Sequence, residues 1–300
     1  MATSTSPAET LKQLIAQSQK NLEAERKLPP EEIRKANLAR ARKIERHLRP
    51  PTLPVGIRFW REGETIPDNA GAKAPHSYTW CEFLSLIRNN GADDRQHLLV
   101  KREDIICHIA PAILGFEEVP PDLAAGKLLG GIHFENIELC ADATAKIPKI
   151  PFRTKAITIG ALEDLPIVPD TIFIAVTPGR TNKVMDGAMW YVGDRFVVQY
   201  GNGCGACGNG CAEPMVSDQV ANLAFMCHGA RRWGGFEDTE LGCGVRIDKF
   251  DAWIKGMENT WLTGHSYPIA HQLMSPVTET HHLPKPGLEY EEAYPYCLDA

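Results

Sequence analysis

Residues 201–211 read GNGCGACGNGC and place three thiols, those of Cys204, Cys207 and Cys211, within eight residues. Almost every other position in this stretch is Gly, Ala or Asn. Thiolates are preferred ligands of soft metals and iron–sulfur clusters, and a Cys-x2-Cys step lets one loop wrap around a metal. Because glycine tolerates positive φ, we expect the loop to turn its backbone N–H groups toward sulfur. The stretch therefore predicts a metal or iron–sulfur site.

The loop contains only three cysteines, so a fourth ligand has to come from elsewhere. Cys227 and Cys243 both follow the loop, and both are flanked by glycine. Local spacing favours Cys204, Cys207, Cys211 and Cys227 as the metal ligands. The alternative interpretation is that these are reduced structural cysteines in a glycine-rich turn.

Composition limits the class of protein. The chain has 300 residues, is 43% hydrophobic and 23% charged, and carries a formal charge of -6. With no basic stripe we expect no nucleic-acid partner, and the longest apolar runs, such as 171–177, are too short for a membrane span. Residues 1–7 lack the features of a secretory signal peptide. Nine cysteines in such a chain favour a reducing cytoplasm, where thiols stay free to bind metal.

The first 50 residues differ from the rest. Helical spacing of apolar residues predicts helices over 8–27 and 31–48, separated by Pro29-Pro30. This segment is highly charged, so we interpret it as a helical N-terminal arm. It is either packed on the body, or used to form a homodimer or to dock a partner. Residues 51–300 are expected to form one cysteine-rich body that ends in an irregular tail.

The body mixes strand and helix patterns and predicts a layered α/β or α+β fold. The strand candidates cover residues 55–60, 98–100, 156–162, 171–177, 195–200 and 245–247. The helix candidates cover residues 80–87, 136–144, 182–191 and 251–262. The predicted strand over 195–200 leads directly into the cysteine loop, and buried strand ends often support functional loops. Asp170, at the start of a strand, is interpreted as a turn residue.

From about Pro54 to Asp248 the sequence resembles the uncharacterised domain-of-unknown-function-169 family of bacteria and archaea. The landmarks are the segments 54–59, 114–115, 165–170, 178–194, 227–232 and 238–240 together with Cys81 and Cys107. The family pattern has four recurrent cysteines, which correspond here to Cys81, Cys107, Cys211 (or else Cys207) and Cys227. The chain departs from that pattern by adding Cys204, Cys207 and Cys243. The resemblance implies no established activity.

Local spacing and the resemblance nominate overlapping ligand sets that share Cys211 and Cys227. The full set of candidate cofactor-binding residues is Cys81, Cys107, Cys204, Cys207, Cys211, Cys227 and Cys243. One compact triple with scattered single cysteines favours one or two [4Fe-4S] clusters over the paired cysteines typical of zinc, which is the alternative metal. Cys297, in the tail, is left out.

Three residues beside Cys227 are candidates for catalysis. Arg231 and Arg232 offer bidentate recognition of an anion, and His228 is a potential proton donor. The competing interpretation is that the arginines pair with the acidic residues at 237–240. His108, next to Cys107, is open to the same two interpretations.

These observations predict an oxygen-sensitive, cytoplasmic iron–sulfur enzyme that acts on a small anionic substrate by reduction, elimination or sulfur chemistry. An alternative is a non-catalytic electron carrier or metal-binding accessory subunit with a redox partner protein. A second alternative is a zinc-stabilised structural module.

Overall fold

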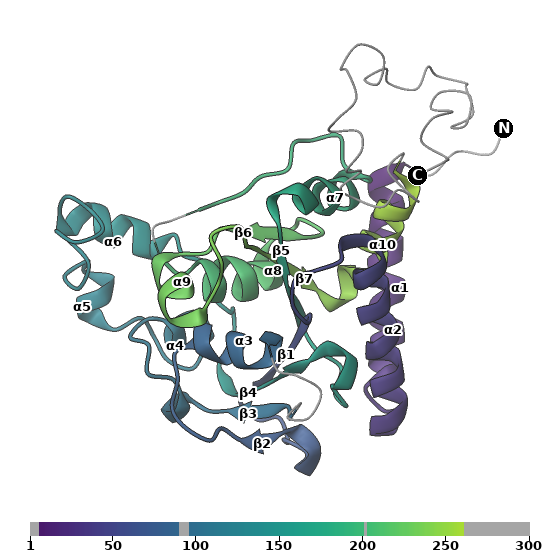
Figure 1. Cartoon of the computed structure of the whole chain (residues 1–300), viewed down its shortest axis with the longest axis horizontal. Helices are drawn as coiled ribbons and strands as arrows, with labels where there is room; N and C mark the ends of the chain where they lie inside the picture. The colour runs from purple at the N-terminus through teal and green to yellow at the C-terminus, as the bar shows by residue number, and fades with distance from the viewer. Residues whose placement is uncertain (1–5, 90–95, 201–202, 261–300) are drawn as a thin grey trace.

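A computed structural model of the chain describes residues 6–89, 96–200 and 203–260, so the predicted irregular tail, 281–300, lies outside it. In the described residues a mixed seven-stranded sheet runs through the molecule, and helices cover both of its faces (Figure 1). The strands are β1 (Val55–Arg61), β2 (Ala72–Lys73), β3 (Leu98–Val100), β4 (Thr154–Ala161), β5 (Thr171–Val176), β6 (Asn222–Ala224) and β7 (Leu241–Arg246). This architecture confirms the predicted mixed α/β class.

The strand order is β2-β3-β4-β1-β5-β7-β6, which places β1 at the centre. Val55 of β1 lies opposite Ala161 of β4 on one side and opposite Phe173 of β5 on the other, and both pairings are antiparallel. The remaining pairings are also antiparallel, except that β2 and β3 run parallel. Every residue of β5 is buried, because helices lie on both sides of it.

Alternate residues of β5 divide the interior into two cores, as expected from the two-residue period of a strand. Phe173 and Ala175 belong to one core, whereas Ile172 and Ile174 belong to the other. The first side, here called the α3 face, is covered by α3 (Trp80–Asn89), α4 (Ala110–Ile113), α9 (His228–Gly234) and the π-helix (Gly205–Ala212). The second, the α1 face, is covered by α1 (Pro7–Glu25), α2 (Pro30–Leu48), α7 (Pro178–Met189) and α10 (Phe250–Asn259).

Shorter helices complete the described chain. Helices α5 (Pro121–Ala124) and α6 (Ile137–Ala145) project from one end of the molecule, and α8 (Glu213–Val216) continues the π-helix (Figure 1). The 3-10 turns are η1 (Asp68–Ala70), η3 (Arg102–Asp104), η4 (Leu162–Asp164) and η6 (Ile247–Lys249).

The two N-terminal helices are confirmed. Helix α1 begins at Pro7, and the hydroxyl of Ser6 caps it by accepting a hydrogen bond from the Glu9 N–H at 3.2 Å. Apolar residues of both helices, including Ile44 and Leu48, are buried in the α1 face. The pair therefore packs on the sheet of its own chain, and a homodimer through these helices stays a prediction.

The predicted strand over residues 195–200 is wrong, because this segment forms no strand. The backbone N–H and C=O of Val197 are bound by the side-chain amide of Gln219, at 2.9 and 2.8 Å. The Gln199 carbonyl accepts a hydrogen bond from Asn209 Nδ2 at 3.0 Å. Side-chain amides thus supply the hydrogen bonds that a neighbouring strand would otherwise provide.

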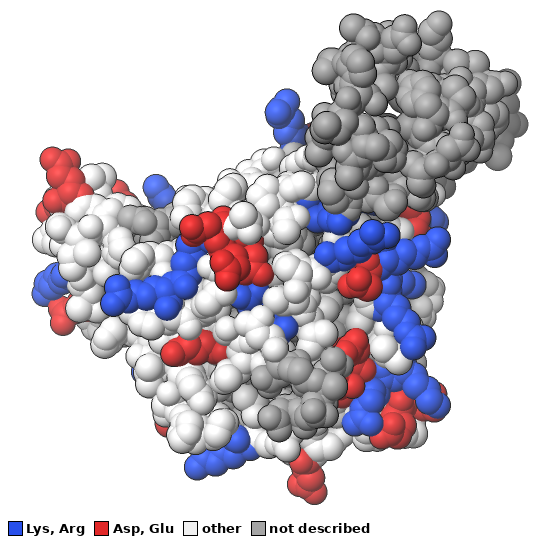
Figure 2. Space-filling view, in the orientation of Figure 1, with Lys and Arg blue, Asp and Glu red and all other residues white. Residues whose placement is uncertain are grey.

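The surface carries charges of both signs. Basic and acidic side chains are interspersed over the face that Figure 2 shows. None of the described helices is both long enough and apolar enough to cross a membrane.

Candidate metal centre

The cysteine loop folds as a buried π-helix. All residues from Gly205 to Ala212 are buried, and the helix is preceded by its N-cap residue Cys204, whose carbonyl accepts a hydrogen bond from the Gly208 N–H at 2.7 Å. Cys204 itself has φ of 64°, in the left-handed region that costs a non-glycine residue about 1–2 kcal/mol. Rare π-helical turns and strained residues of this kind gather at functional sites.

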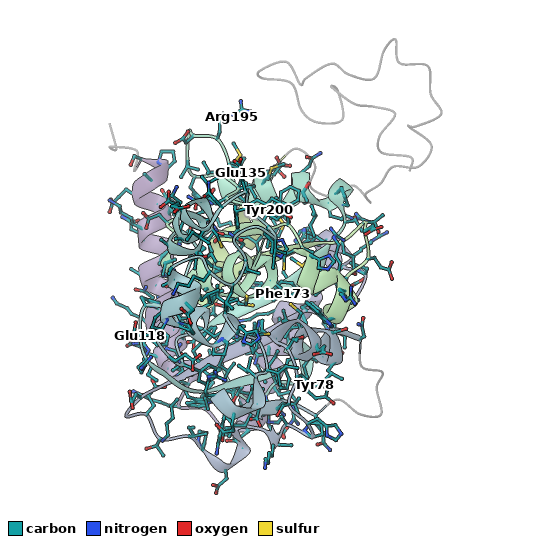
Figure 3. The ribbon with its side chains drawn as sticks, turned by 90° about the vertical axis from the view of Figure 1, so that its left-hand side faces the viewer. Tyr78, Glu118, Glu135, Phe173, Arg195 and Tyr200 are labelled. Carbon is teal, nitrogen blue, oxygen red and sulfur yellow. The ribbon has the colours of Figure 1, made fainter. Side chains whose placement is uncertain are left out.

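Within the described part of the loop the glycines do not take the positive φ that was expected, and positive φ is found at Cys204 instead. Two of these glycines serve close packing. A Cβ on Gly205 would lie 2.0 Å from the Phe225 carbonyl oxygen, and one on Gly210 would lie 2.6 Å from the ring of Phe173. Phe173 lies in the middle of the molecule, below Tyr200 in Figure 3. Glycine therefore lets the π-helix rest directly on the sheet and on the segment before α9.

Six of the predicted cysteines lie together on the α3 face, and we call this group the thiol site. Its members come from the start of α3, the segment before α4, the π-helix with its N-cap residue, and the N-cap of α9: Cys81, Cys107, Cys204, Cys207, Cys211 and Cys227. Four of them are buried, whereas Cys107 and Cys204 are partly exposed. Cys207 is the common neighbour, since it interacts electrostatically with each of the other five.

The surroundings of four of these thiols, those of Cys81, Cys107, Cys207 and Cys211, favour the protonated form. Burial raises the pKa of Cys107 from 9.0 to about 12 and raises the pKa of Cys81 and of Cys211 further. The pKa of Cys207 is raised first by its hydrogen bond with Cys204 and then by burial. Because neighbouring thiolates would repel one another, the site favours thiolates only when a cation is present, and a coordinating metal removes the thiol protons outright.

Trp80 is a residue of the site that sequence reasoning missed. Its backbone N–H donates to Cys107 Sγ at 3.3 Å, and its indole N–H donates to Cys211 Sγ at 3.4 Å. The side chain is fully buried, so both donors are fixed in place. Hydrogen bonds to sulfur tune the potential of a cluster. The only sequence signal was the position of Trp80 immediately before Cys81.

Cys243 does not join the thiol site. It lies on β7 and points to the α1 face, opposite Ile174 of β5 and Leu223 of β6. The glycines on either side of it point to the α3 face instead, and a Cβ on Gly244 would lie 2.3 Å from the Gly210 carbonyl oxygen. Strand alternation thus separates Cys243 from the other candidates. Cys297 lies outside the described residues.

Of the three predicted catalytic residues, Arg231 binds the acidic segment 237–240 of its own chain. Its guanidinium donates to the Glu237 carbonyl oxygen and, at 3.5 Å, to the Glu240 carbonyl oxygen, and it lies 3.8 Å from the Asp238 carboxylate. These contacts match the competing interpretation, in which this arginine holds the acidic segment. Arg231 therefore positions the 237–240 turn beside α9.

The other two candidates lie at the surface of α9. His228 is exposed, and its ring packs edge-on against Trp233 at 6.3 Å between centroids. Arg232 is also exposed and lies 5.8 Å from the centre of the same indole. His108 is exposed as well. His228 and Arg232 thus flank one exposed tryptophan next to Cys227.

The donor set consists of thiols, the ligand type that soft metals and iron–sulfur clusters share. A mononuclear zinc site requires ligands that converge on one point, and within the described residues no group of three His, Cys, Asp or Glu side chains is placed to hold one ion. In an iron–sulfur cluster the cysteines bind different iron atoms, so they surround a larger core. Several buried thiols from separate elements, with N–H groups donating to sulfur, supply the ligand type that such a cluster uses.

Residues 43–256 match the domain-of-unknown-function-169 family, described as uncharacterised ArCR. The chain belongs to this family. The match covers all strands of the sheet and every cysteine of the thiol site, and it extends beyond both ends of the resemblance inferred from the sequence.

A curated relative of this DUF169 protein is the uncharacterized protein MJ0308 of Methanocaldococcus jannaschii. The two are 22% identical over 216 residues, which cover 70% of this chain and 90% of the relative. No solved structure matches the chain.

Proposed function

We propose that this DUF169 protein is an iron–sulfur protein in which the thiol site holds one [4Fe-4S] cluster, and that it is an oxygen-sensitive enzyme acting on a small anionic substrate. The observation that carries the proposal is the convergence of six thiols from four separate segments in one core. Burying so many thiols together is unfavourable for their ionised form unless a cation compensates. A bound cluster provides that cation and uses the thiolates as ligands.

For the ligands we propose Cys81, Cys107, Cys211 and Cys227, the set implied by the family resemblance. The hydrogen bonds from Trp80 support this set, because they are received by Cys107 and Cys211. Local spacing supports instead a set in which two cysteines of the 204–211 loop replace those at 81 and 107. Single serine substitutions distinguish the sets.

The experiment measures iron and acid-labile sulfide in single serine variants of the six thiols of the site and of Cys243, all purified without oxygen. The proposal expects Cys81→Ser and Cys107→Ser to lose most of the iron, whereas Cys204→Ser retains it. Cys243→Ser is the matched control, because this buried thiol faces the other side of the sheet. Loss of iron in the variants at 204 and 207, with retention at 81 and 107, would overturn the proposed ligand set in favour of the set that local spacing supports.

When bound, the cluster would supply either electrons or, with one iron left open, a Lewis acid for a substrate oxygen or sulfur. The chain's own residues would bind and orient that substrate. We propose that Arg232 binds its anionic group and that His228 donates a proton, since both are exposed on α9 directly after Cys227. Arg231 positions the neighbouring turn.

These roles are tested by measuring turnover and iron content in His228→Gln and Arg232→Gln. The expected result is that both variants lose turnover of the small anionic substrate while their iron content stays unchanged. Arg102→Gln is a control, because it removes an exposed arginine that lies outside α9 in the sequence and pairs with Glu117. Unchanged turnover in both α9 variants would contradict the assigned roles.

A second candidate function is that of an electron carrier or accessory subunit with a redox partner protein. It is favoured by the exposed apolar side chains next to the site in sequence: Ile106 is 58% exposed beside Cys107, and Phe225 and Trp233 are 42% and 52% exposed on either side of Cys227. A surface of this kind suits a protein partner. Reduction of the protein by an electron donor without any turnover of small anions would favour this candidate.

A further inference from the structure

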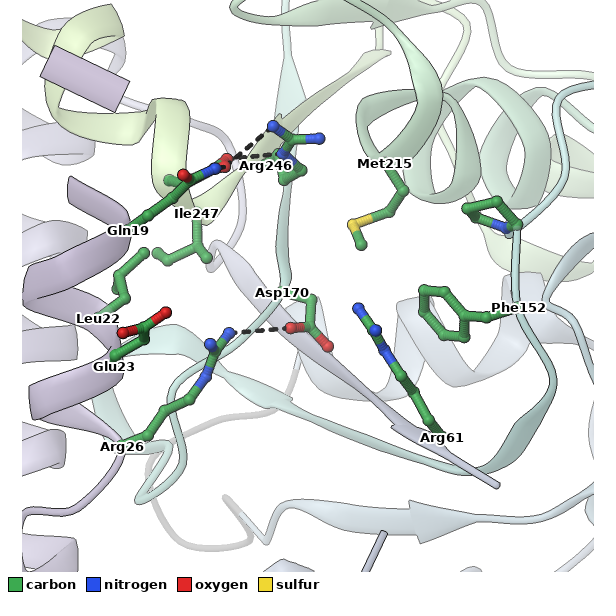
Figure 4. Close-up of a pocket in the computed structure, with 12 residues that line it drawn as sticks. Gln19, Leu22, Glu23, Arg26, Arg61, Phe152, Asp170, Met215, Arg246 and Ile247 are labelled. Atoms are coloured by element: carbon green, nitrogen blue, oxygen red, sulfur yellow. Dashed lines mark hydrogen bonds and ion pairs between the residues drawn. The ribbon is translucent and has the colours of Figure 1, made fainter. Parts of the chain in front are cut away.

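A charged cavity of about 510 Å³ lies where the ends of β1 and β7 and the start of β5 meet helix α1. Figure 4 shows Arg61, Arg246 and Arg26 around this cavity, with Phe152 and Met215 on the opposite wall from α1. Leu22 and Ile247 add further apolar surface. The cavity is therefore lined partly by guanidinium groups and partly by apolar side chains, which is typical of a site for a small organic ion.

Two arginines near the cavity share one carboxylate. Asp170 is only 8% exposed; Arg58 Nη1 donates to its two oxygens at 2.7 and 2.9 Å, and the Phe59 N–H donates to it at 2.8 Å. Arg26 Nη2 donates to the same carboxylate at 3.2 Å. Asp170 was interpreted from sequence as a turn residue, and the structure shows that it also fixes two arginine side chains by direct contact. Both oxygens of the Asp170 carboxylate already accept hydrogen bonds, so neither is left to bind a further cation.

A second carboxylate fixes the arginine at the end of β7. Arg246 donates to both oxygens of Asp248, at 2.6 and 2.9 Å, and Gln19 Nε2 donates to that carboxylate at 2.8 Å. Because a guanidinium carries five N–H donors, this pairing leaves donors of Arg246 available to the cavity.

Arg61 differs from the other three arginines. Its guanidinium lies over the ring of Phe152, 4.3 Å from the centroid, and projects into the cavity in Figure 4. No carboxylate in the described part of the chain forms an ion pair with it, whereas Arg26, Arg58 and Arg246 each have one. Glu23, on the exposed side of α1, also lines the cavity. The cavity thus holds one exposed guanidinium that is stacked on a ring and has no ion-pair partner among the described residues.

We infer that this cavity binds the oxyanion group of a small organic molecule, a carboxylate or a phosphate ester. Arg61 forms the main ion pair, the spare donors of Arg246 add hydrogen bonds, and Phe152, Met215 and Leu22 contact the apolar part of the ligand. Planar guanidinium groups match both carboxylate and phosphate oxygens. The site is separate from α9 and does not depend on an iron–sulfur cluster.

The test is isothermal titration calorimetry with succinate and with glycerol phosphate, at low ionic strength, on the full chain. The inference predicts saturable binding of at least one probe, weakened about tenfold or more in Arg61→Gln through loss of a charge-assisted hydrogen bond. The probe that binds shows whether the ligand is a carboxylate or a phosphate ester. Arg153→Gln is the matched control, because it removes the same charge from an exposed neighbour outside the cavity lining.

A variant that is expected to strengthen binding excludes misfolding as the explanation for weaker binding. Glu23→Gln removes a negative charge from the rim and is expected to strengthen binding of the same probe. Failure of both probes to bind the wild-type protein, or equal binding by wild type and Arg61→Gln, would overturn the inference. Iron and sulfide content, measured on the same samples, reports separately on the proposed cluster.

Discussion

The indole N–H of Trp80 donates to the Sγ of Cys211 at 3.4 Å, joining residues 131 positions apart in the chain. This contact links α3 to the π-helix in a fully buried position. It places a hydrogen-bond donor on a sulfur that we propose to be a cluster ligand.

Trp80→Phe removes this donor while keeping an aromatic ring in the core. One hydrogen bond worth about 1 kcal/mol corresponds to roughly 40 mV in a one-electron potential, and its loss makes the cluster harder to reduce. We therefore expect the potential to become more negative by about that amount in a spectroelectrochemical titration. Trp253→Phe is the control, since its indole donates to the Val184 carbonyl oxygen at 3.1 Å on the other face of the sheet. An equal shift of the potential in both variants would contradict the assignment of Cys211 as a cluster ligand that accepts a hydrogen bond from Trp80.

The buried thiols make the metal-free protein sensitive to high pH. The pKa of Cys107 rises from 9.0 to about 12 on folding because of burial, so the unfolded chain releases this proton first. The stability that the protonated thiol contributes is complete below pH 9 and is lost as the pH rises toward 12. Urea unfolding of metal-free protein should show this fall, and Cys107→Ser should reduce its slope. The same slope in the serine variant would contradict the prediction.

The packing of the π-helix depends on Gly205. An alanine Cβ there would lie 2.0 Å from the backbone oxygen of Phe225, which cannot rotate away as a side chain can. Gly205→Ala should lower the free energy of unfolding by about 1–3 kcal/mol or more and reduce the iron content. Gly203→Ala is the control: nothing lies within 4 Å of its Cβ position, so its effect should stay within about 0.5 kcal/mol. Equal stabilities of the two variants in urea titrations would count against this packing.

A buried ion pair holds the turn beside α9. Arg88 and Glu240 lie 2.8 Å apart, with side chains only 2% and 5% exposed, and Arg88 also stacks on Phe236 at 3.9 Å. Arg88→Met leaves a buried carboxylate without its partner and should cost about 3–5 kcal/mol in chemical denaturation. Lys35→Met, which breaks an exposed pair with Glu32, should cost no more than about 1 kcal/mol. Similar losses of unfolding free energy in the two variants would contradict the prediction, because they would show that burial does not determine how much an ion pair contributes to stability.

Much of the fold followed from local pattern, because apolar spacing and proline boundaries act within short segments. The helices predicted over 8–27 and 31–48 and the strands over 55–60 and 171–177 agree with α1, α2, β1 and β5 within a few residues. The predicted strand over 195–200 failed because Phe196 and Val198 pack on a core without joining the sheet, while Val197 and Tyr200 are exposed.

The candidate site depended more on tertiary structure. Six of the seven predicted cysteines come together, since local spacing and the family resemblance pointed to the same region of the fold. Cys243 stayed apart because strand alternation, which decides its face, can be read only once the neighbouring strands are known. The role of Trp80 was not predictable, because its sulfur partner lies in a distant segment.

The most direct measurement of the central claim is iron and acid-labile sulfide per chain, with an absorption spectrum, on protein purified without oxygen. The account predicts about four irons and four sulfides, with broad absorbance that bleaches on addition of dithionite. Zinc without sulfide, or a metal-free protein with all six thiols of the site open to alkylation after unfolding, would contradict it.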